Sequence, residues 1–268
     1  MRKRCRERYR IAQIILLIHL AVASRFVSAQ QTSPPTLDRI LSQLEINLNR
    51  YDKQVPDFFC TEHVNSSLVY GKKRQSTITD SIFRVERSLS GTLIESREIK
   101  AVNGSSAEGR QLGGPVVLGG VFSGGLDAVS LRQNACMSYT LQPIAPGRQN
   151  APYVIQFSTL PDARHHSECV LKEEGSGRVL IDPATMQVTR MELSAPNHQI
   201  NPAEIGTWYI SIDYAPAALA GKTFWMPTTI RSTETPAATD YTPAVYSFSA
   251  TYTDYHKLEV TSHIVPSR

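Results

Sequence analysis

The residues best suited to chemistry lie between positions 163 and 169, in the segment ARHHSEC. Alternate side chains of an extended strand share a face, so His166 and Glu168 would project to the same side. An imidazole and a carboxylate can bind zinc, but a site needs three or four ligands. No C-x-x-C, H-E-x-x-H or EF-hand pattern supplies the others. We interpret this segment as a polar strand edge or loop, and an enzyme built on His166 and Glu168 is the least favoured hypothesis.

A glycine-rich segment from Gly104 to Gly125 is the second place to look for chemistry, because closely spaced glycines can hold a phosphate. It has eight glycines in 22 residues but contains neither G-x-G-x-x-G nor G-x-x-x-x-G-K-[ST]. Ser123 and Ser176 each lie beside a glycine, but neither fits G-x-S-x-G. We expect an irregular loop at the rim of a groove, or a disordered one. The sequence predicts no catalytic residue, no metal site and no cofactor.

The first 29 residues have the parts of a secretory signal peptide. A basic start precedes an apolar run from Ile11 to Ala23, and small residues lead to a predicted cleavage site after Ala29. The run is shorter than the roughly 20 residues of a membrane span. We therefore expect an exported protein, periplasmic or extracellular, with no span in the mature chain. Residues 30–35 would be a linker, and residues 36–268 a single β-rich domain.

Cleavage changes the charge of the chain. The full sequence has a net charge of +4, but the signal peptide carries seven of its 28 basic and one of its 24 acidic residues. The mature chain is therefore slightly acidic, with a net charge of −2. It has no basic stripe interleaved with aromatic residues, so nucleic acid is not an expected partner.

Three cysteines follow the cleavage site, namely Cys60, Cys136 and Cys169. Export permits disulfides, and an odd count leaves one cysteine unpaired within the chain. All three pairings are open. We favour Cys136 with Cys169, because their segments flank one predicted strand, PYVIQFS, and would lie close together in a meander.

Residues 36–51 are predicted to form an amphipathic helix. Thr36 is a suitable N-cap, and Pro56 marks the last point at which the helix can end. The apolar stripe recurs at helical spacing and consists of Leu37, Ile40, Leu41, Leu44, Leu48 and Tyr51.

After Pro56 the chain has mainly the alternation of antiparallel strands, with one covered and one polar face. We predict a hairpin at Asp182-Pro183-Ala184-Thr185, because these residue types in this order are typical of a turn. We interpret Asp182 as a turn former. Residues 215–222, APAALAGK, are predicted to be a turn region. Large aromatic side chains gather on the covered face of the last strands, at Trp208, Tyr214, Phe224, Tyr246, Phe248 and Tyr252.

Several segments together resemble a group of uncharacterised exported bacterial proteins: ILSQLEINLNRYDKQVPDFFCTEHV, VNG, GRVLIDPATMQVTRMEL, ISIDYAPAALAGKTFWMPTTI and YSFSATYTDYHKLEV. That group is similar in strand order to the periplasmic lipoprotein carriers of the LolA and LolB type. The resemblance implies an α+β fold, with an N-terminal amphipathic helix packed on a strongly curved, mainly antiparallel sheet that forms an incomplete barrel. It also implies that Cys60 is the free thiol, because TDYHKLEV lacks the cysteine that relatives have near the end.

Two noncatalytic functions are therefore expected. In the first, an envelope protein holds a lipid or a lipidated partner in an apolar groove between sheet and helix, lined by the six aromatic residues named above. In the alternative, a structural protein binds another envelope protein through its polar face and the glycine-rich segment. The sequence has no recognisable counterpart of the arginine that controls groove opening in the carriers.

Overall fold

The computed structural model describes residues 35–107, 122, 126–143, 151–201, 204–237 and 244–259. The predicted signal peptide, nearly all of its linker, and residues 108–121 and 123–125 of the glycine-rich segment lie outside this part. The chain divides into the units Met1–Pro35 and Thr36–Arg268. Everything below concerns the second unit.

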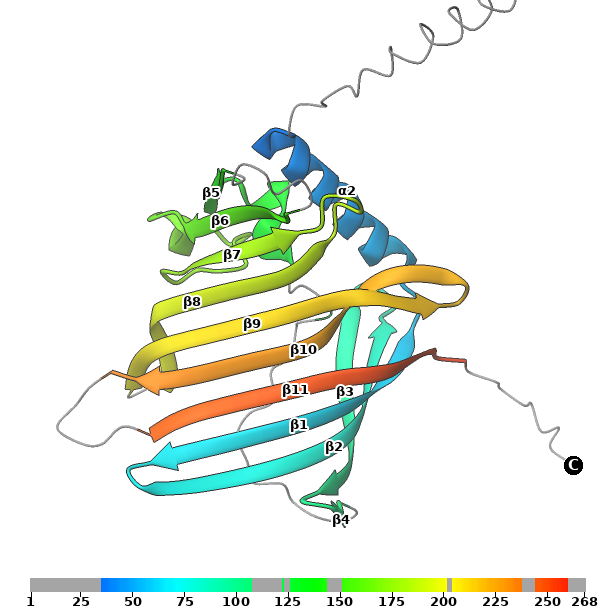
Figure 1. The fold of residues 1–268 in the computed structure, drawn as a ribbon, viewed down its shortest axis with the longest axis vertical. Coiled ribbons are helices and arrows are strands. Elements are labelled where there is room, and N and C mark those ends of the chain that lie inside the picture. Colours follow the sequence, from blue (N-terminus) through cyan, green and yellow to red (C-terminus); the bar gives the residue numbers. More distant parts are fainter. Residues whose placement is uncertain are drawn as a thin grey trace, which may run out of the picture. The chain divides into compact units, whose positions relative to one another are not determined.

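The described part of this unit holds one α-helix, three short 3-10 helices and eleven strands (Figure 1). The helices are α2 (Leu37–Gln54), η1 (Asp127–Val129), η2 (Leu131–Gln133) and η3 (Ala163–His165). The strands are β1 (Phe58–Tyr70), β2 (Lys73–Arg87), β3 (Leu93–Val102), β4 (Ser105–Ser106), β5 (Met137–Leu141), β6 (Tyr153–Thr159), β7 (Ser176–Ile181), β8 (Val188–Asn201), β9 (Glu204–Leu219), β10 (Lys222–Pro236) and β11 (Ala244–Lys257).

All of these strands belong to one sheet, in the order β4-β3-β2-β1-β11-β10-β9-β8-β7-β6-β5. Each pairing is antiparallel. The end strands β4 and β5 are not neighbours, so the sheet stays open. It consists of two meanders, β1 to β4 and β5 to β11, that meet where β11 pairs with β1. The predicted antiparallel, unclosed sheet is confirmed.

Helix α2 follows the predicted pattern. The Thr36 hydroxyl accepts a hydrogen bond from the Arg39 backbone N–H at 3.4 Å, which caps the N-terminus. Ile40, Leu41 and Leu44 are buried. Figure 1 shows α2 along the ends of β6, β7 and β8, reaching the β9–β10 hairpin. Its apolar stripe is thus covered by the sheet.

The β7–β8 hairpin forms as predicted at Asp182. Its carboxylate accepts hydrogen bonds from the Thr185 hydroxyl at 2.6 Å and from the Ala184 and Thr185 backbone N–H groups at 3.3 and 3.2 Å. Met186 ends the turn with φ of +54°. Asp182 is therefore a turn former, as its sequence context indicated.

The predicted turn at residues 215–222 is too long. Strand β9 continues to Leu219, and the turn consists of Ala220 and Gly221, with φ of +51° and +73°. Pairing with β10 keeps this alanine- and proline-rich stretch extended. Tertiary pairing has overridden a low intrinsic strand propensity.

Candidate functional site

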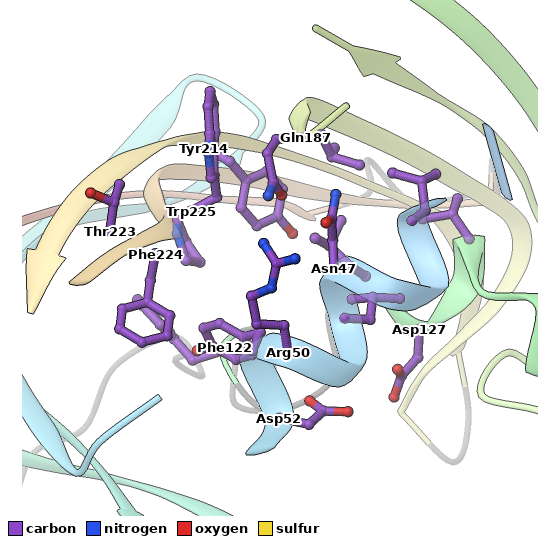
Figure 2. Close-up of a pocket in the computed structure, with 17 residues that line it drawn as sticks. Asn47, Arg50, Asp52, Phe122, Asp127, Gln187, Tyr214, Thr223, Phe224 and Trp225 are labelled. Carbon is purple, nitrogen blue, oxygen red and sulfur yellow. The ribbon is translucent and has the colours of Figure 1, made fainter. Parts of the chain in front are cut away.

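A cavity of about 80 Å³ lies between α2, the β7–β8 hairpin and the β9–β10 hairpin (Figure 2). Apolar side chains form most of its wall, and polar and charged side chains form the rest. Its lining residues are Leu44, Asn47, Leu48, Arg50, Tyr51, Asp52, Phe122, Leu126, Asp127, Val129, Gln187, Val188, Tyr214, Thr223, Phe224, Trp225 and Pro227.

Direct contacts hold α2 against both hairpins. The Asn47 side-chain amide donates a 2.7 Å hydrogen bond to the Met186 carbonyl oxygen, in the turn that Asp182 sets up. The Tyr51 ring meets the Phe224 ring edge to face, with centroids 6.5 Å apart. The cavity is therefore enclosed by elements that are themselves fixed to one another.

Two buried hydroxyl groups in the cavity wall have no hydrogen-bond partner among the described residues. They belong to Tyr51 and Tyr214. Leaving a buried hydroxyl unpaired costs about 1–3 kcal/mol, and such groups are rare in native proteins. Burial raises the pKa of both phenols far above the ordinary value, so both remain protonated and able to donate.

Arg50 brings a positive charge to the same cavity. Its side chain is exposed and makes no hydrogen bond or ion pair with any residue in the described ranges. Figure 2 shows its guanidinium directed to the space that the Tyr214 hydroxyl also faces, near Asn47 and Gln187.

Two acids, Asp52 and Asp127, complete the lining. Burial raises the pKa of both carboxyls, and the Asp52 charge raises that of Asp127 further. Asp52 also lies 3.6 Å from the Arg132 guanidinium. In Figure 2 both acids lie across the helix from the Arg50 guanidinium. Arg50 and Tyr214 thus lie on the other side of the helix from the two acids, whereas the Asp52 charge acts on the Tyr51 phenol.

Of the six aromatic residues predicted to line a groove, Tyr214 and Phe224 line this cavity. The other four lie elsewhere on the same face of the sheet. The Trp208 indole N–H donates to the Ser232 hydroxyl at 2.8 Å, and the Tyr252 hydroxyl donates to the Glu62 carboxylate at 2.9 Å.

Phe122 is a lining residue that the sequence pattern missed. Of residues 108–125 in the glycine-rich segment, the structure describes Phe122. Its side chain is buried. Its ring lies among Phe83, Tyr252, Phe58 and Tyr255, at centroid distances of 4.8, 5.0, 5.9 and 6.4 Å. The available signal was one large aromatic residue among glycines and small residues.

Tyr255 reaches this cluster through a bulge. Asp254 has φ of +55°, and the β1–β11 register shifts opposite Phe59 and Thr61. A bulge of this kind moves the following side chains to the other face. Strict alternation from Tyr246 onward did not allow for the shift that brings Tyr255 inward.

A buried ion pair lies beside the aromatic cluster. The Glu62 side chain is fully buried, and the Arg97 Nε donates to its two oxygens at 2.9 and 2.8 Å. The Arg97 guanidinium also lies 4.7 Å from the centre of the Phe83 ring. Glu62 has the same parity as the buried Cys60 and Val64, which was a signal in the sequence that an acid would lie inside.

The residues first considered for chemistry do not assemble into a larger site. His166 Nδ1 and Glu168 Oε1 are 3.3 Å apart on side chains that are 44% and 56% exposed. They follow η3 in a loop, which is one of the two placements, strand edge or loop, that the sequence indicated. Within the described ranges no group of three or more His, Cys, Asp or Glu residues could hold a metal ion.

The nearby cysteines do form a bond. Cys136 and Cys169 are joined in a disulfide, the pairing that the sequence favoured. Cys60 is the free cysteine of the described part and is buried. Burial, chiefly, raises the pKa of its thiol to about 12, so the group is protonated and unreactive at neutral pH.

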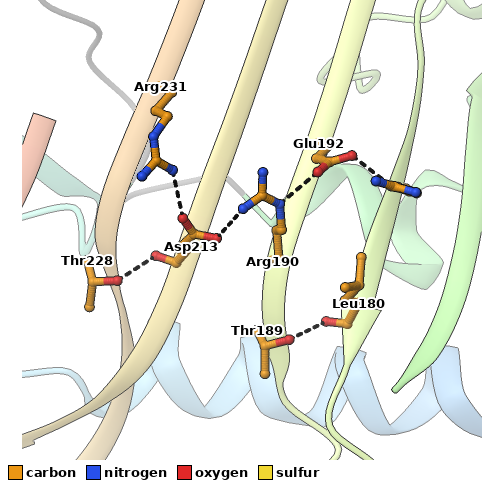
Figure 3. Close-up of polar contacts among 8 residues, drawn as sticks. Leu180, Thr189, Arg190, Glu192, Asp213, Thr228 and Arg231 are labelled. Carbon is orange, nitrogen blue, oxygen red and sulfur yellow. Dashed lines mark hydrogen bonds and ion pairs between the residues drawn. The ribbon is translucent and has the colours of Figure 1, made fainter. Parts of the chain in front are cut away.

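The opposite, polar face of the sheet carries a chain of ion pairs across four strands (Figure 3). Arg231 and Arg190 both bind Asp213, at 3.0 and 2.9 Å, and Arg190 and Arg178 both bind Glu192, at 2.7 Å. Beside these ion pairs is a hollow of about 470 Å³. Its lining residues are Ser138, Thr140, Gln156, Phe157, Ser158, Ser176, Gly177, Arg178, Glu192, Ser194 and Tyr209.

Comparisons with known proteins give only distant likenesses. No protein-family model matches the sequence, and a search of curated proteins found no match. The structure is similar to a DUF1329 family protein from Desulfovibrio piger, with a TM-score of 0.40 and 9% identity over 83% of this chain and 95% of that one. It is also similar to a putative outer membrane lipoprotein-sorting protein domain from Vibrio parahaemolyticus, with a TM-score of 0.37 and 11% identity over 82% and 92% of the two chains.

A search for membrane-spanning helices in the described part found none of sufficient length and apolar character.

Proposed function

We propose that this chain is a noncatalytic binding protein of the cell envelope, which holds a lipid or a lipidated partner between α2 and the sheet. The observation that carries the proposal is the largely apolar cavity at this junction, lined by Leu48, Phe224 and Trp225. Sites for apolar ligands are concave and mostly apolar, with a few placed polar groups. The predicted export signal supports the envelope location.

Ligand binding requires a local expansion of this cavity. Small-molecule sites typically enclose about 300–1,000 Å³, whereas this cavity measures about 80 Å³. The present volume admits a few waters or a small head group and excludes a long acyl chain. We therefore expect the chain of a ligand to separate α2 from the β9–β10 hairpin as it enters.

The test is binding of a fluorescent fatty-chain probe, together with native mass spectrometry of protein purified from its own envelope and lipid analysis of the extract. Trp225→Ala removes a half-buried cavity wall, and Trp208→Ala removes a half-buried tryptophan away from the cavity. We expect Trp225→Ala to weaken probe binding at least fivefold and Trp208→Ala to leave it unchanged. Absence of bound lipid and of probe binding to the wild type would refute the proposal.

A second candidate function is protein binding through the polar face. It is supported by the hollow over β5 to β9, where Ser138, Ser158, Ser176 and Ser194 lie directly opposite one another. Small hydroxyl side chains leave this surface accessible to a partner. A photo-crosslinking residue at Ser158, compared with one at Arg39 on α2, tests it: a single envelope protein captured only from Ser158 supports this function.

A further inference from the structure

The cavity lining is more specific than a plain apolar groove requires. Two buried phenol hydroxyls, of Tyr51 and Tyr214, line it without a partner among the described residues. Apolar chains offer nothing to a hydroxyl donor, so a lipid tail alone leaves both groups unsatisfied. Polar ligand atoms inside the cavity would satisfy them.

The charge of those ligand atoms is indicated by Arg50. Its guanidinium has no hydrogen-bond or ion-pair partner in the described part of the chain, and Figure 2 shows it directed to the same space as the Tyr214 hydroxyl. A guanidinium can only donate hydrogen bonds, and a protonated phenol can donate one as well. The Arg50 guanidinium and the Tyr214 hydroxyl together select an acceptor group, and a guanidinium favours an anionic one.

The acids in the lining do not cancel this preference. Asp52 pairs with Arg132, and Figure 2 places Asp52 and Asp127 across the helix from the Arg50 guanidinium. An anion beside Tyr214 therefore meets the cation first.

The size of the cavity chooses among anions. A water needs roughly 10–15 Å³ of cavity space of this kind, so about 80 Å³ accommodates a group comparable to roughly five to eight waters. A carboxylate fits this space and is smaller than a phosphate, which favours it as the head group. The half-buried Leu48 and Trp225 continue the wall with apolar surface on which an attached chain can lie.

We infer that the cavity recognises the carboxylate of a long-chain fatty acid, with Arg50 supplying the charge and the Tyr214 hydroxyl donating a hydrogen bond. This inference rests on the proposed lipid-binding function and specifies its ligand class. It places the head group at the helix–hairpin junction and the chain between α2 and β10.

The test measures affinities of the full mature protein for hexadecanoic acid, its methyl ester and hexadecyl phosphate by displacement of a fluorescent fatty-chain probe. We expect the wild type to bind the acid at least tenfold more tightly than the ester or the phosphate. Arg50→Gln should remove the preference for the acid over the ester, and Tyr214→Phe should weaken acid binding severalfold without affecting the ester. Arg39→Gln, an exposed arginine on the same helix outside the cavity, is the matched control and should behave as wild type.

The outcomes separate the two proposals. Equal binding of acid and ester by the wild type overturns the carboxylate site and leaves lipid binding intact. Phosphate binding as tight as acid binding overturns the choice of a carboxylate. If Arg39→Gln also loses the preference for the acid, the preference depends on the general surface charge. That result would overturn the role of Arg50 as the carboxylate-binding residue. A bound probe that none of the three ligands displaces overturns the fatty-acid site alone, whereas absence of both probe binding and bound lipid refutes the lipid-binding function itself.

Discussion

Glu62 and Arg97 are the residues whose burial most needs compensation. A carboxylate with no exposed surface is tolerated because Arg97 binds both of its oxygens and Tyr252 donates a third hydrogen bond. Buried pairs of this kind contribute little net stability compared with an apolar pair of equal volume, but removing one partner leaves an uncompensated charge. A substitution at either position is therefore tolerated only when the other residue of the pair is replaced as well.

Glu62→Ala is expected to lower the free energy of unfolding by about 3–5 kcal/mol, because Arg97 loses the buried carboxylate that accepts from its Nε. The double variant Glu62→Leu, Arg97→Met should recover most of that loss. Urea denaturation followed by circular dichroism measures both. Glu98→Ala serves as control, since its ion pairs with Arg84 and Lys100 are exposed and its loss should change little. A double variant no more stable than Glu62→Ala would contradict this account.

At the scale of elements, α2 is held by contacts at both of its sides. One side meets the hairpins through Asn47, and the other is tied to η1 and η2 through Glu45. The Glu45 carboxylate accepts hydrogen bonds from the Ser130 hydroxyl and from the Arg132 Nε. Arg132 also donates to Asn49 at 2.6 Å. Since the proposed ligand enters beneath α2, these contacts set how easily the helix moves.

The tie through Glu45 should depend on pH. Burial by itself would raise the pKa of Glu45, but the Ser130 and Arg132 contacts outweigh it and lower the pKa below the ordinary 4.5. A group whose pKa is lowered by folding stabilises the fold above its unfolded pKa, and the contribution disappears as pH falls through the folded value.

Glu45→Gln should therefore cost about 1–2 kcal/mol of unfolding free energy at pH 6 to 7. The difference from wild type should stay constant down to about pH 5 and shrink below about pH 4.5. Denaturant midpoints measured from pH 7 to pH 3 give the result. A difference that is independent of pH across this range would show that the carboxylate charge is not what anchors the helix.

At the scale of the whole unit, an open sheet leaves two edges that a closed barrel would not have. The β4 edge is only two residues long, and the β5 edge is five residues long. Short edge strands reduce pairing with other chains. The Cys136–Cys169 disulfide lies next to β5 in the chain and joins the edge to the loop that precedes β7.

Replacing both Cys136 and Cys169 with alanine should destabilise the protein by about 4 kcal/mol in the chain-entropy description, for a sequence separation of 33 residues. Thermal unfolding of the oxidised wild type and the double variant measures the loss. In the double variant, backbone amide hydrogen exchange should accelerate most in β5 and β6 and least in β1 and β11 at the centre of the sheet. Cys60→Ala is the control, because it removes a cysteine that is not part of a disulfide. Uniform loss of protection in all strands would contradict a role confined to the edge.

Much of the local structure followed from the sequence, because it depends on neighbours in the chain. The apolar stripe of α2 repeats with every helical turn. The Thr36 cap and the Asp182 turn are each formed by contacts within four residues. Strand alternation identified the covered face and so included Tyr214 and Phe224. The cysteine pairing was favoured from the strand between Cys136 and Cys169, and the fold resemblance added the open sheet.

What only the tertiary structure decided depends on residues far apart in the chain. The extension of β9 through residues 215–219 required β10 beside it, and the inward turn of Tyr255 required a bulge against β1. Nothing local indicated that Arg97 would reach Glu62, that Phe122 would enter the aromatic cluster, or that Arg50 and Tyr214 would face one cavity across 163 intervening positions. Periodicity tells which face a side chain occupies. The partner it meets there is set by strand order, register and helix placement, which sequence spacing does not encode.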